Sequence, residues 1–427
     1  MKKKISPALM LVTCIALFFS SCRKNIEIQH QDEPTALNFE KNHANDESKK
    51  IYVSNLTELY DAINNPQNAG STIVLAPGTY KLNPDYPNGG RLDFLHNMKL
   101  TGKQGHKEAV IIDVSNLPPS SLTLPPVPPA TGSSRVGAIR MGNGSNTIEW
   151  VTVQNDPAHT IRSLIQTDIV TTPETQIRVA HCIIKGSSIG LSIINRDPEA
   201  NGRILEADIS DNEIMNNTIQ QFGSGIQIQN TLVNNALIKV RLSRNYVHGN
   251  KAGMMIFNSS SQDCSLEVKS YNERIEDNGV GLVFVSGLIL NAIKPAENNK
   301  LSYEAYATSL TKNNGLPAPP FSFPPGGIFA ATGLAMTQFG PPGTTHYNQL
   351  DIRFYGSVIK NNIGSAQIKA YGAYSYYALP PFNNTTLAGT NNKTNVFLNG
   401  LGATATVNAV NSFPVESAGT NTVNLFN

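Results

Sequence analysis

Apolar and polar residues alternate along short stretches of this chain, and the alternation returns at intervals. The stretch IKVRLSRNYVHGNKAGMMIFN (238–258) holds an alternating run, an Asn, a Gly and a second alternating run. A period of two predicts a strand, so each stretch reads as strand, polar bend and strand. Similar stretches lie at 175–195, 205–230, 266–286 and, less closely, 350–370. None has the 3.6-residue period of a helix, which favours a β-solenoid over leucine-rich, ankyrin or helical repeats.

Aligned copies of the repeat give rows of similar residues. One row lies at a bend. It begins with Ser187 and continues with four asparagines, Asn217, Asn250, Asn278 and Asn362. Because stacked coils lie ~4.8 Å apart, this row predicts a ladder of side-chain hydrogen bonds. A glycine row predicts a bend that tolerates positive φ, at Gly190, Gly225, Gly253 and Gly281. Alternate strand positions are expected to stack inside the coils.

Together these rows resemble the right-handed parallel β-helix of pectin-lyase-like proteins. The resemblance implies an all-β fold, a right-handed parallel β-helix solenoid. The segments SNLTELYDAINN and STIVLAPGTYKL look like the N-terminal cap of secreted β-helix proteins. Asn55 and Glu58 have capping-box spacing, and one helix face is apolar, at Leu56, Leu59, Tyr60 and Ile63. We expect this short helix to cover the open end of the core.

The first 22 residues are expected to be a targeting segment rather than part of the fold. MKKKISPALMLVTCIALFFSSC has a basic start, an apolar middle and small residues before Cys22. FSSC resembles a bacterial lipobox, which implies lipidation of Cys22 and attachment to the outer membrane, on its periplasmic or cell-surface side. An ordinary signal peptide or an uncleaved anchor is the alternative. Residues 23–50 are polar and aperiodic, which predicts a flexible tether before a β-helix domain at 51–427.

Two segments interrupt the predicted coils. Residues 116–135 form a Pro-rich insertion, and residues 287–349 break the repeat for 63 residues with many Phe, Leu and Met. Four apolar residues fall on outward-facing strand positions: Met255, Phe257, Val283 and Val285. Because an exposed apolar face needs a cover, we expect residues 287–349 to fold over it as a flap.

Composition limits the classes of partner. The formal net charge is +2 over 427 residues, and no basic run is interleaved with aromatics, so nothing indicates nucleic-acid binding. The 33 Gly and 26 Pro suit many turns within one domain, and we expect a monomer. Cys182 and Cys264 are expected to be free and buried, because coils two or more steps apart exceed the ~7 Å limit between bridged Cα atoms.

Enzymes of the family that the chain resembles mostly cleave acidic polysaccharides. The resemblance implies a lyase with an Arg or Lys base, often with calcium, or a hydrolase with paired carboxylates. The polygalacturonase strings NTD, DD, GHG and RIK and the pectate-lyase string WIDH are absent. RDPEANGR resembles the pectate-lyase RxPxxR motif but is longer, so Arg196 would be the base and Arg203 its companion, or both belong to a Pro-containing turn. Arg241 is a further catalytic candidate.

Charged residues fall into outward rows. One row holds Arg178, Asp208, Arg241, Lys269 and Arg353, and a second, nearer the bend, holds His181, Asp211 and Arg244. Opposite charges on adjacent coils are close enough to pair, so the rows form either an ion-pair ladder or a groove for a uronic or sulfated sugar. The aromatic segment YGAYSYYALPPF offers either a sugar platform or packing for the last coils, through Tyr374, Tyr376 and Tyr377.

The sequence therefore predicts a lipid-anchored cell-envelope β-helix that binds acidic polysaccharide, and that cleaves it if the arginines are catalytic. A non-catalytic adhesin or envelope scaffold is the alternative from a different class. Outward carboxylates and basic residues that converge in a cleft would favour an enzyme, whereas a flat ladder of charges would favour a scaffold.

Overall fold

The fold is seen in a computed structural model, which describes residues 49–119, 137–142, 144–161, 163–167, 174–196, 200–219, 223–289, 295–313, 326–336, 344–362, 368–376, 387–399, 407–409, 415–416 and 421–426. The predicted leader, nearly all of the predicted tether, most of the 116–135 insertion and Tyr377 lie outside these ranges. Within them, no helix has both the length and the apolar content that a bilayer crossing requires.

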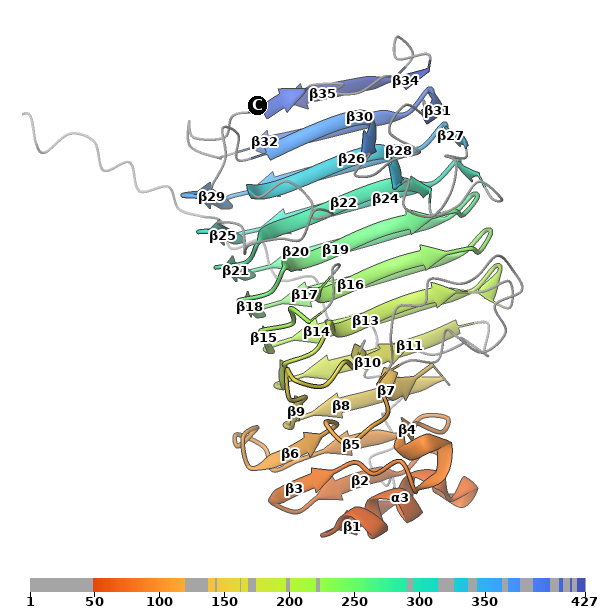
Figure 1. The fold of residues 1–427 in the computed structure, drawn as a ribbon, viewed down its shortest axis with the longest axis vertical. Coiled ribbons are helices and arrows are strands. Elements are labelled where there is room, and N and C mark those ends of the chain that lie inside the picture. The colour runs from red at the N-terminus through yellow and green to blue at the C-terminus, as the bar shows by residue number, and fades with distance from the viewer. Residues whose placement is uncertain are drawn as a thin grey trace, which may run out of the picture. The chain divides into compact units, whose positions relative to one another are not determined.

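Strands from successive coils stack into parallel sheets in chain order (Figure 1). Sheet A has 12 strands: β1 (Lys50–Val53), β2 (Thr72–Leu75), β5 (Lys99–Thr101), β8 (Ser145–Glu149), β11 (Glu174–Ala180), β14 (Ile204–Ser210), β17 (Leu237–Ser243), β20 (Ser265–Tyr271), β24 (Lys300–Tyr306), β28 (Gln349–Tyr355), β32 (Lys393–Asn399) and β35 (Thr422–Phe426). Sheet B has nine: β3 (Gly78–Lys81), β6 (Val110–Asp113), β9 (Thr152–Gln154), β12 (Ile183–Lys185), β15 (Glu213–Met215), β18 (Tyr246–His248), β21 (Arg274–Glu276), β25 (Ser309–Thr311) and β29 (Val358–Lys360).

Sheet C completes each coil with ten strands: β4 (Leu92–Asp93), β7 (Gly137–Met141), β10 (Ser163–Thr167), β13 (Ile189–Arg196), β16 (Ser224–Thr231), β19 (Ala252–Ser259), β22 (Val280–Ile289), β26 (Gly326–Met336), β30 (Ile368–Tyr376) and β33 (Val407–Ala409). A four-stranded sheet D joins the later coils, with β23 (Ala296–Glu297), β27 (Thr344–His346), β31 (Leu387–Thr390) and β34 (Val415–Glu416). Strands pair in parallel with their counterparts one coil away, as the predicted right-handed parallel β-helix requires.

Inward-facing side chains of the three sheets form one continuous core. In sheet A the positions of Ile177, Ala207 and Val240 are in register, and all three side chains are buried. The row continues through Val268, Tyr303 and Ile352. Each coil thus places apolar side chains directly over those of the coil before, which is what the alternating pattern predicted.

A helix closes the N-terminal end of this core. Helix α3 (Leu56–Asn64) begins after Asn55, whose Oδ1 accepts a hydrogen bond from the Glu58 N–H at 3.0 Å. The Glu58 carboxylate accepts in return from the Ser54 N–H at 2.7 Å. The apolar face is buried, at Leu59, Tyr60, Ala62 and Ile63. Two short 3-10 turns, η1 (Pro66–Asn68) and η2 (Pro87–Gly90), follow in the first coils.

An asparagine ladder runs along the bend between sheets B and C. The Oδ1 of Asn250 accepts hydrogen bonds from the backbone and side-chain N–H groups of Asn217, at 3.0 and 2.9 Å. Asn250 in turn donates to Asn278 at 3.0 and 3.1 Å. Asn313, absent from the sequence-derived row, is the next rung and connects Asn278 to Asn362. A second ladder, before sheet A, joins Asn299, Asn348, Asn392 and Asn421.

The glycine row serves close approach rather than positive φ. Gly190, Gly225, Gly253 and Gly281 are not among the residues with positive φ. A Cβ at Gly225 would lie 2.8 Å from the carbonyl oxygen of Gly253 and 2.7 Å from Val247. The expectation of a positive-φ bend was therefore wrong, because these glycines open sheet C strands and leave room for the neighbouring coil.

The predicted insertion at 287–349 is largely made of coil strands. It contains β24, β25 and β26, which pair with β20, β21 and β22 of the preceding coil. Wider and unequal spacing between these strands hides the repeat in the sequence. The expected flap is therefore wrong for the described part of this segment.

The apolar outward positions of sheet C are buried side by side along the sheet. Met255, Phe257, Val283 and Val285 belong to one cluster. Phe329, Ala331 and Leu334 extend the cluster from within 287–349, because β26 lies next to β22 in the same sheet. Residues of the predicted flap therefore contact the patch as neighbours in the strand order.

Candidate functional site at the bend between sheets A and B

The bend between sheets A and B carries a row of residues in an unusual backbone conformation. The bend row is defined here as the residue that follows each sheet A strand from β5 to β28: Gly102, Trp150, His181, Asp211, Arg244, Asn272, Ala307 and Gly356. From Trp150 onward each has a φ between 52° and 59°. Every N–H from Trp150 to Ala307 donates to a carbonyl oxygen of the next coil, for example Arg244 to Tyr271 at 2.9 Å.

Bulky side chains are costly in this left-handed region. At the bend between sheets B and C the corresponding positions are mostly the residues that tolerate it, namely Asn216, Gly249, Asp277 and Asn361, with Lys312 among them. A residue other than Gly, Asn or Asp costs roughly 1–2 kcal/mol in this region. Trp150, His181 and Arg244 carry that cost within four consecutive coils, and Ala307 carries it two coils further on. Strained positions cluster at functional sites.

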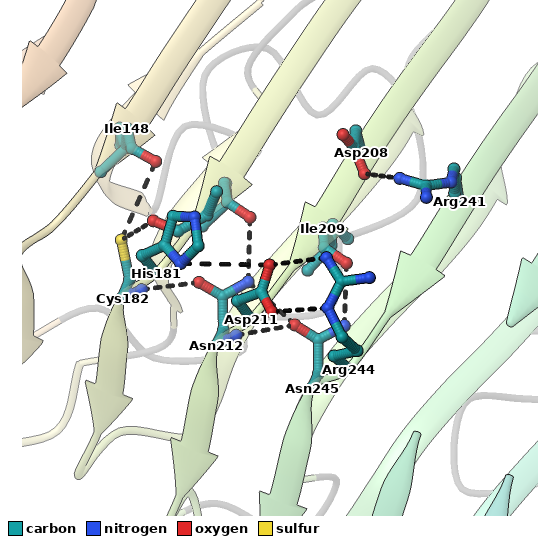
Figure 2. Close-up of polar contacts among 12 residues, drawn as sticks. Ile148, His181, Cys182, Asp208, Ile209, Asp211, Asn212, Arg241, Arg244 and Asn245 are labelled. Carbon is teal, nitrogen blue, oxygen red and sulfur yellow. Dashed lines mark hydrogen bonds and ion pairs between the residues drawn. The ribbon is translucent and has the colours of Figure 1, made fainter. Parts of the chain in front are cut away.

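The side chains of the bend row contact one another in sequence. The Trp150 indole stacks on the His181 ring, with centroids 4.0 Å apart and planes 9° from parallel. His181 Nδ1 lies 4.0 Å from Asp211 Oδ2, as Figure 2 shows. Arg244 donates two hydrogen bonds to the same carboxylate, from Nε to Oδ1 at 2.8 Å and from Nη2 to Oδ2 at 3.0 Å. The Arg244 side chain keeps 46% of its surface exposed. Four coils therefore present a connected line of aromatic, acidic and basic groups.

His181 has charges on several sides. Burial lowers its pKa first, Asp211 and Glu149 oppose that effect, and Arg178 and Arg244 reinforce it. The net direction is downward, so the neutral imidazole is favoured. A neutral ring stacks on an indole without a charge to desolvate, which fits the parallel contact with Trp150.

The charged row of sheet A is more balanced than its sequence suggested. Glu304 stands between Lys269 and Arg353, because the coil that carries it had been assigned to an insertion. Arg241 pairs with Asp208 at 3.3 Å, and Arg353 pairs with Glu304 at 3.2 Å. The Asp208 side chain is only 3% exposed, so it is not a surface ligand. At these positions the row forms the ion-pair ladder that was one of the two alternatives from the sequence.

Two basic residues of this row have no acidic partner among the described residues, Arg178 and Lys269. Lys269 is exposed, and no ion pair within 4.0 Å is recorded for it there. The Nε of Arg178 is buried and has no hydrogen-bond partner. These two side chains, rather than Arg241, are the ones available to an anion.

A tyrosine ladder continues the surface beyond Arg244. Tyr271 stacks on Tyr306, and Tyr306 stacks on Tyr355, with centroids 5.1 and 4.9 Å apart. Stacked rings cover each other's faces, so this ladder shows mainly ring edges and hydroxyls outward. It packs the face of the coils more than it offers a platform for sugar rings.

A second polar cluster lies on sheet B, beside the bend row. His248 Nε2 is 3.3 Å from Glu213 Oε1, and its ring stacks on Tyr246 with centroids 4.0 Å apart. The Tyr246 hydroxyl donates to Glu276 at 2.8 Å, and Arg274 pairs with the same carboxylate. Burial, with help from Glu276, raises the pKa of Tyr246 to about 12. These groups can accept and donate protons, although the Tyr246 hydroxyl stays protonated at neutral pH because its pKa is raised.

Beneath the bend row lies an inner ladder of different composition. Cys182 donates its N–H to Asn212, Asn212 donates to Asn245, and Asn245 donates to Glu273 at 3.1 Å. Burial raises the pKa of Glu273 to about 8, against the hydrogen bonds from Asn245, so the carboxyl is mostly protonated at neutral pH. Cys182 and Cys264 are free and buried, and burial raises the pKa of Cys182 to about 12.

The predicted catalytic arginines lie on different parts of the coil. Arg196 ends β13 in sheet C, Arg203 precedes β14, and Arg241 lies in sheet A. No hydrogen bond or ion pair recorded for the described residues joins any two of them. Tyr374 and Tyr376 belong to β30, opposite Leu334 and Met336, several coils beyond the part of the bend row that runs from Trp150 to Arg244. No group of three or more metal-binding side chains occurs in the described ranges.

Sequence reasoning missed the tyrosine ladder and the importance of Trp150. Aligning LSYEAYATSL with LEVKSYNERI and LDIRFYGSVI would have placed Tyr306 between Tyr271 and Tyr355. Trp150 follows β8, whose short repeat copy was not recognised. The tyrosines are the last residues of their strands, whereas Trp150 directly follows its strand.

Known proteins resemble this chain only distantly. No protein-family model matches the chain, and no curated protein matches it in sequence. Among solved structures, XylC in complex with xylose is 10% identical over 88% of this chain and 86% of its own, with a TM-score of 0.34. The A-module of the mannuronan C-5 epimerase AlgE4 of Azotobacter vinelandii is 10% identical over 87% of this chain and 95% of its own, at 0.33. Escherichia coli YbhC is 9% identical over 72% and 84%, at 0.32. Scores this low carry no functional argument, and the fold rests on the strand pairing above.

Proposed function

We propose that this protein binds acidic polysaccharide along the bend row and the adjoining face of sheet A. The observation that carries the proposal is the connected line from Trp150 to Arg244, kept in a backbone conformation that favours smaller residues. Arg178 and Lys269 supply positive charge beside it. Coils repeat every ~4.8 Å, close to the advance of one sugar unit along an extended glycan, so one chain could meet equivalent positions on successive coils.

Removing the available charges tests this binding. We expect Arg178→Ala with Lys269→Ala to weaken affinity for a uronate polymer several-fold at low salt, and to converge with the unmodified protein at high salt, since exposed charges are screened beyond about 8 Å. Lys81→Ala with Lys360→Ala is the matched control, because it removes two exposed lysines of sheet B. Equal loss in both pairs would indicate a net-charge effect, and an unaffected test pair would favour a scaffold without a glycan.

We further propose that the protein is held at the outer membrane through lipidated Cys22. The support is the sequence alone, with its basic start, apolar stretch and FSSC ending. Mass spectrometry of the purified protein, with and without Cys22→Ser, tests the lipid. A Cys22→Ser protein that fractionates with membranes as before would contradict the anchor.

Cleavage is a second candidate function, favoured by the sheet B cluster. In a β-elimination, His248 held by Glu213 would take the proton next to the uronate carboxylate. The bond to the leaving oxygen would break as the ring double bond forms, and a proton from Tyr246 or solvent would complete the leaving hydroxyl. Absorbance of the unsaturated product, measured with and without calcium, tests this. Binding without any product, in both conditions, would leave a purely binding protein.

A further inference from the structure

Tyr347 holds a strained backbone position on the later coils, directly before Asn348 of the second asparagine ladder. Its N–H donates to the carbonyl oxygen of Thr390 on the next coil, and its φ is 56°. Equivalent positions on other coils make the same kind of bond and are all Asn or Asp: Asn235, Asp263, Asn298 and Asn391. These types tolerate positive φ, whereas a tyrosine is strained there. Strain of this kind is tolerated mostly at functional positions.

The Tyr347 side chain reaches solvent. The residue is 61% exposed, although it is large and aromatic. Among the described residues its one recorded ring contact is a tilted one with His346, with centroids 6.3 Å apart and planes at 52°. Packing against the core therefore does not account for this tyrosine. An exposed ring of this kind suits the apolar CH face of a sugar.

His346 holds a hydrogen-bond donor beside this ring. Its Nδ1 accepts a hydrogen bond from the Thr390 backbone N–H at 3.2 Å and lies 2.8 Å from the Thr390 hydroxyl oxygen. Because Nδ1 accepts, the ring hydrogen lies on Nε2. That nitrogen has no partner among the described residues and is not one of their buried unpaired atoms. The Nε2–H group is therefore fixed in place and available to a ligand hydroxyl.

Glu297 gives the same surface a negative charge. It is in register with His346 on the neighbouring strand of sheet D, and Gln262 Nε2 donates to its carboxylate at 3.1 Å. Within the described ranges no ion pair within 4.0 Å is recorded for Glu297. The carboxylate can accept hydrogen bonds from hydroxyls, but it repels another carboxylate. A uronate polymer is therefore not expected here.

This surface lies away from the bend between sheets A and B. Figure 1 shows β27 and β31 at the edge of the later coils, opposite the short sheet B strands β21, β25 and β29. Asn298 and Asn391, on the coils before and after Tyr347, are exposed and uncharged. The surroundings of the tyrosine thus combine an aromatic ring, amides, one imidazole donor and one carboxylate acceptor.

We propose that Tyr347, His346 and Glu297 form a binding site for one neutral sugar unit, separate from the surface proposed for acidic polysaccharide. The sugar's apolar face lies on the Tyr347 ring. One hydroxyl accepts a hydrogen bond from His346 Nε2–H, and another donates to the Glu297 carboxylate. A protein with both surfaces would bind an acidic and a neutral glycan at different bends of the coil.

Tyr347→Asn tests the site without threatening the fold, because Asn is the residue type found at the equivalent positions of neighbouring coils. Neutral oligosaccharides of glucose, mannose, galactose and xylose, two to six units long, are titrated against the full chain by calorimetry. For those that bind, Tyr347→Asn should weaken affinity about five- to tenfold, and Tyr347→Phe should retain most of it. The melting temperature of Tyr347→Asn should be no lower than that of the unmodified protein. Tyr52→Ala is the matched control, since Tyr52 is 74% exposed on β1.

Glu297→Gln tests the selection against acidic sugars. It is made together with Arg178→Ala and Lys269→Ala, so that the charges of the other surface do not contribute. Oligouronates should bind this triple variant several-fold more tightly than the double variant alone, because a repelling carboxylate has been removed. No gain in affinity would contradict the role given to Glu297.

The remaining outcomes separate this site from the proposed function. Unchanged neutral-sugar affinity in Tyr347→Asn, or an equal loss in Tyr52→Ala, would overturn the site, as would the absence of any neutral oligosaccharide that binds the unmodified protein. Oligouronates titrated against the unmodified protein report the acidic surface independently. That surface can therefore stand if the Tyr347 site fails, and the Tyr347 site can stand if no oligouronate binds.

Discussion

Two bends of the same coil are built from different residues. The bend between sheets B and C has an unbroken inner ladder from Asn217 to Asn362, and its left-handed positions are mostly Asn, Asp and Gly. The bend between sheets A and B has an inner ladder that changes from Cys182 to Asn to Glu273, under outer residues as large as Trp150 and Arg244. The first follows the backbone preferences of its residue types except at Lys312, and the second departs from them at Trp150, His181, Arg244 and Ala307.

The comparison teaches that one coil can keep a regular structural bend between sheets B and C and place its candidate functional residues at the bend between sheets A and B. At the bend between sheets A and B, neighbouring residues have opposite roles. Asn245 is buried in the inner ladder, while Arg244, one residue before it, extends outward and pairs with Asp211. Strain is tolerated in the outer residue because the inner one fixes the backbone.

Breaking the regular bend should have the largest effect. Asn250→Leu removes the acceptor for two hydrogen bonds from Asn217 and leaves buried N–H groups unpaired. Each unpaired buried group costs about 1–3 kcal/mol, so we expect a loss of about 3–5 kcal/mol in the free energy of unfolding. Thermal and urea unfolding measure it, with exposed Asn216→Gly as the control. An unchanged midpoint for Asn250→Leu would contradict a structural role for the ladder.

Making the irregular inner ladder resemble the regular one should stabilise the protein in a pH-dependent way. In the unfolded chain the Glu273 carboxyl ionises near its ordinary pKa of 4.5, but in the folded chain burial holds the pKa at about 8. Stability from this group is therefore full below pH 4.5 and is lost as the pH rises to about 8. Glu273→Gln should add about 1–3 kcal/mol at pH 8 and little at pH 4.5. If Glu273→Gln changed the free energy of unfolding by the same amount at pH 8 and at pH 4.5, the Glu273 carboxyl would not be held protonated in the folded protein.

Much of the fold follows from the sequence, because alternation and ladder residues repeat at each coil. The amides of Asn217, Asn250, Asn278 and Asn362 do stack, and inward rows such as Ile177 and Ala207 lie in register. The coil of Tyr303 and Glu304 was missed because the spacing to its neighbours is unequal. That omission made the sheet A row look more basic than it is.

The candidate site could be predicted only in part. His181, Asp211 and Arg244 fall in one row by alignment, but the sequence does not reveal that their φ values are positive. Burial of Asp208 and the stacking of Trp150 on His181 depend on contacts between coils. Local sequence patterns predict which face of a coil a residue lies on, but they do not predict its contacts with the neighbouring coils.

At the bend between sheets A and B, replacing the outer residue Arg244 should affect stability less than replacing its buried neighbour Asn245. Arg244→Asn puts a residue that tolerates positive φ at this position, and it removes one partly exposed ion pair. We expect stability within about 1 kcal/mol of the unmodified protein, since the two changes oppose each other. Affinity for a uronate polymer should fall several-fold at low salt. Asn245→Leu is the matched neighbour and should lose stability instead, whereas a stability loss of similar size in Arg244→Asn would assign that residue a structural role.

Hydroxyl-radical footprinting tests the functional assignment of the bend between sheets A and B most directly. Oxidation of each side chain is measured by mass spectrometry, with and without a uronate polymer at low salt. We predict several-fold protection of Trp150 and His181, and no protection of Tyr347, which is 61% exposed and holds a positive-φ position at a different bend. Protection of Tyr347 with unchanged oxidation of Trp150 and His181, under conditions where the polymer binds, would contradict the assignment.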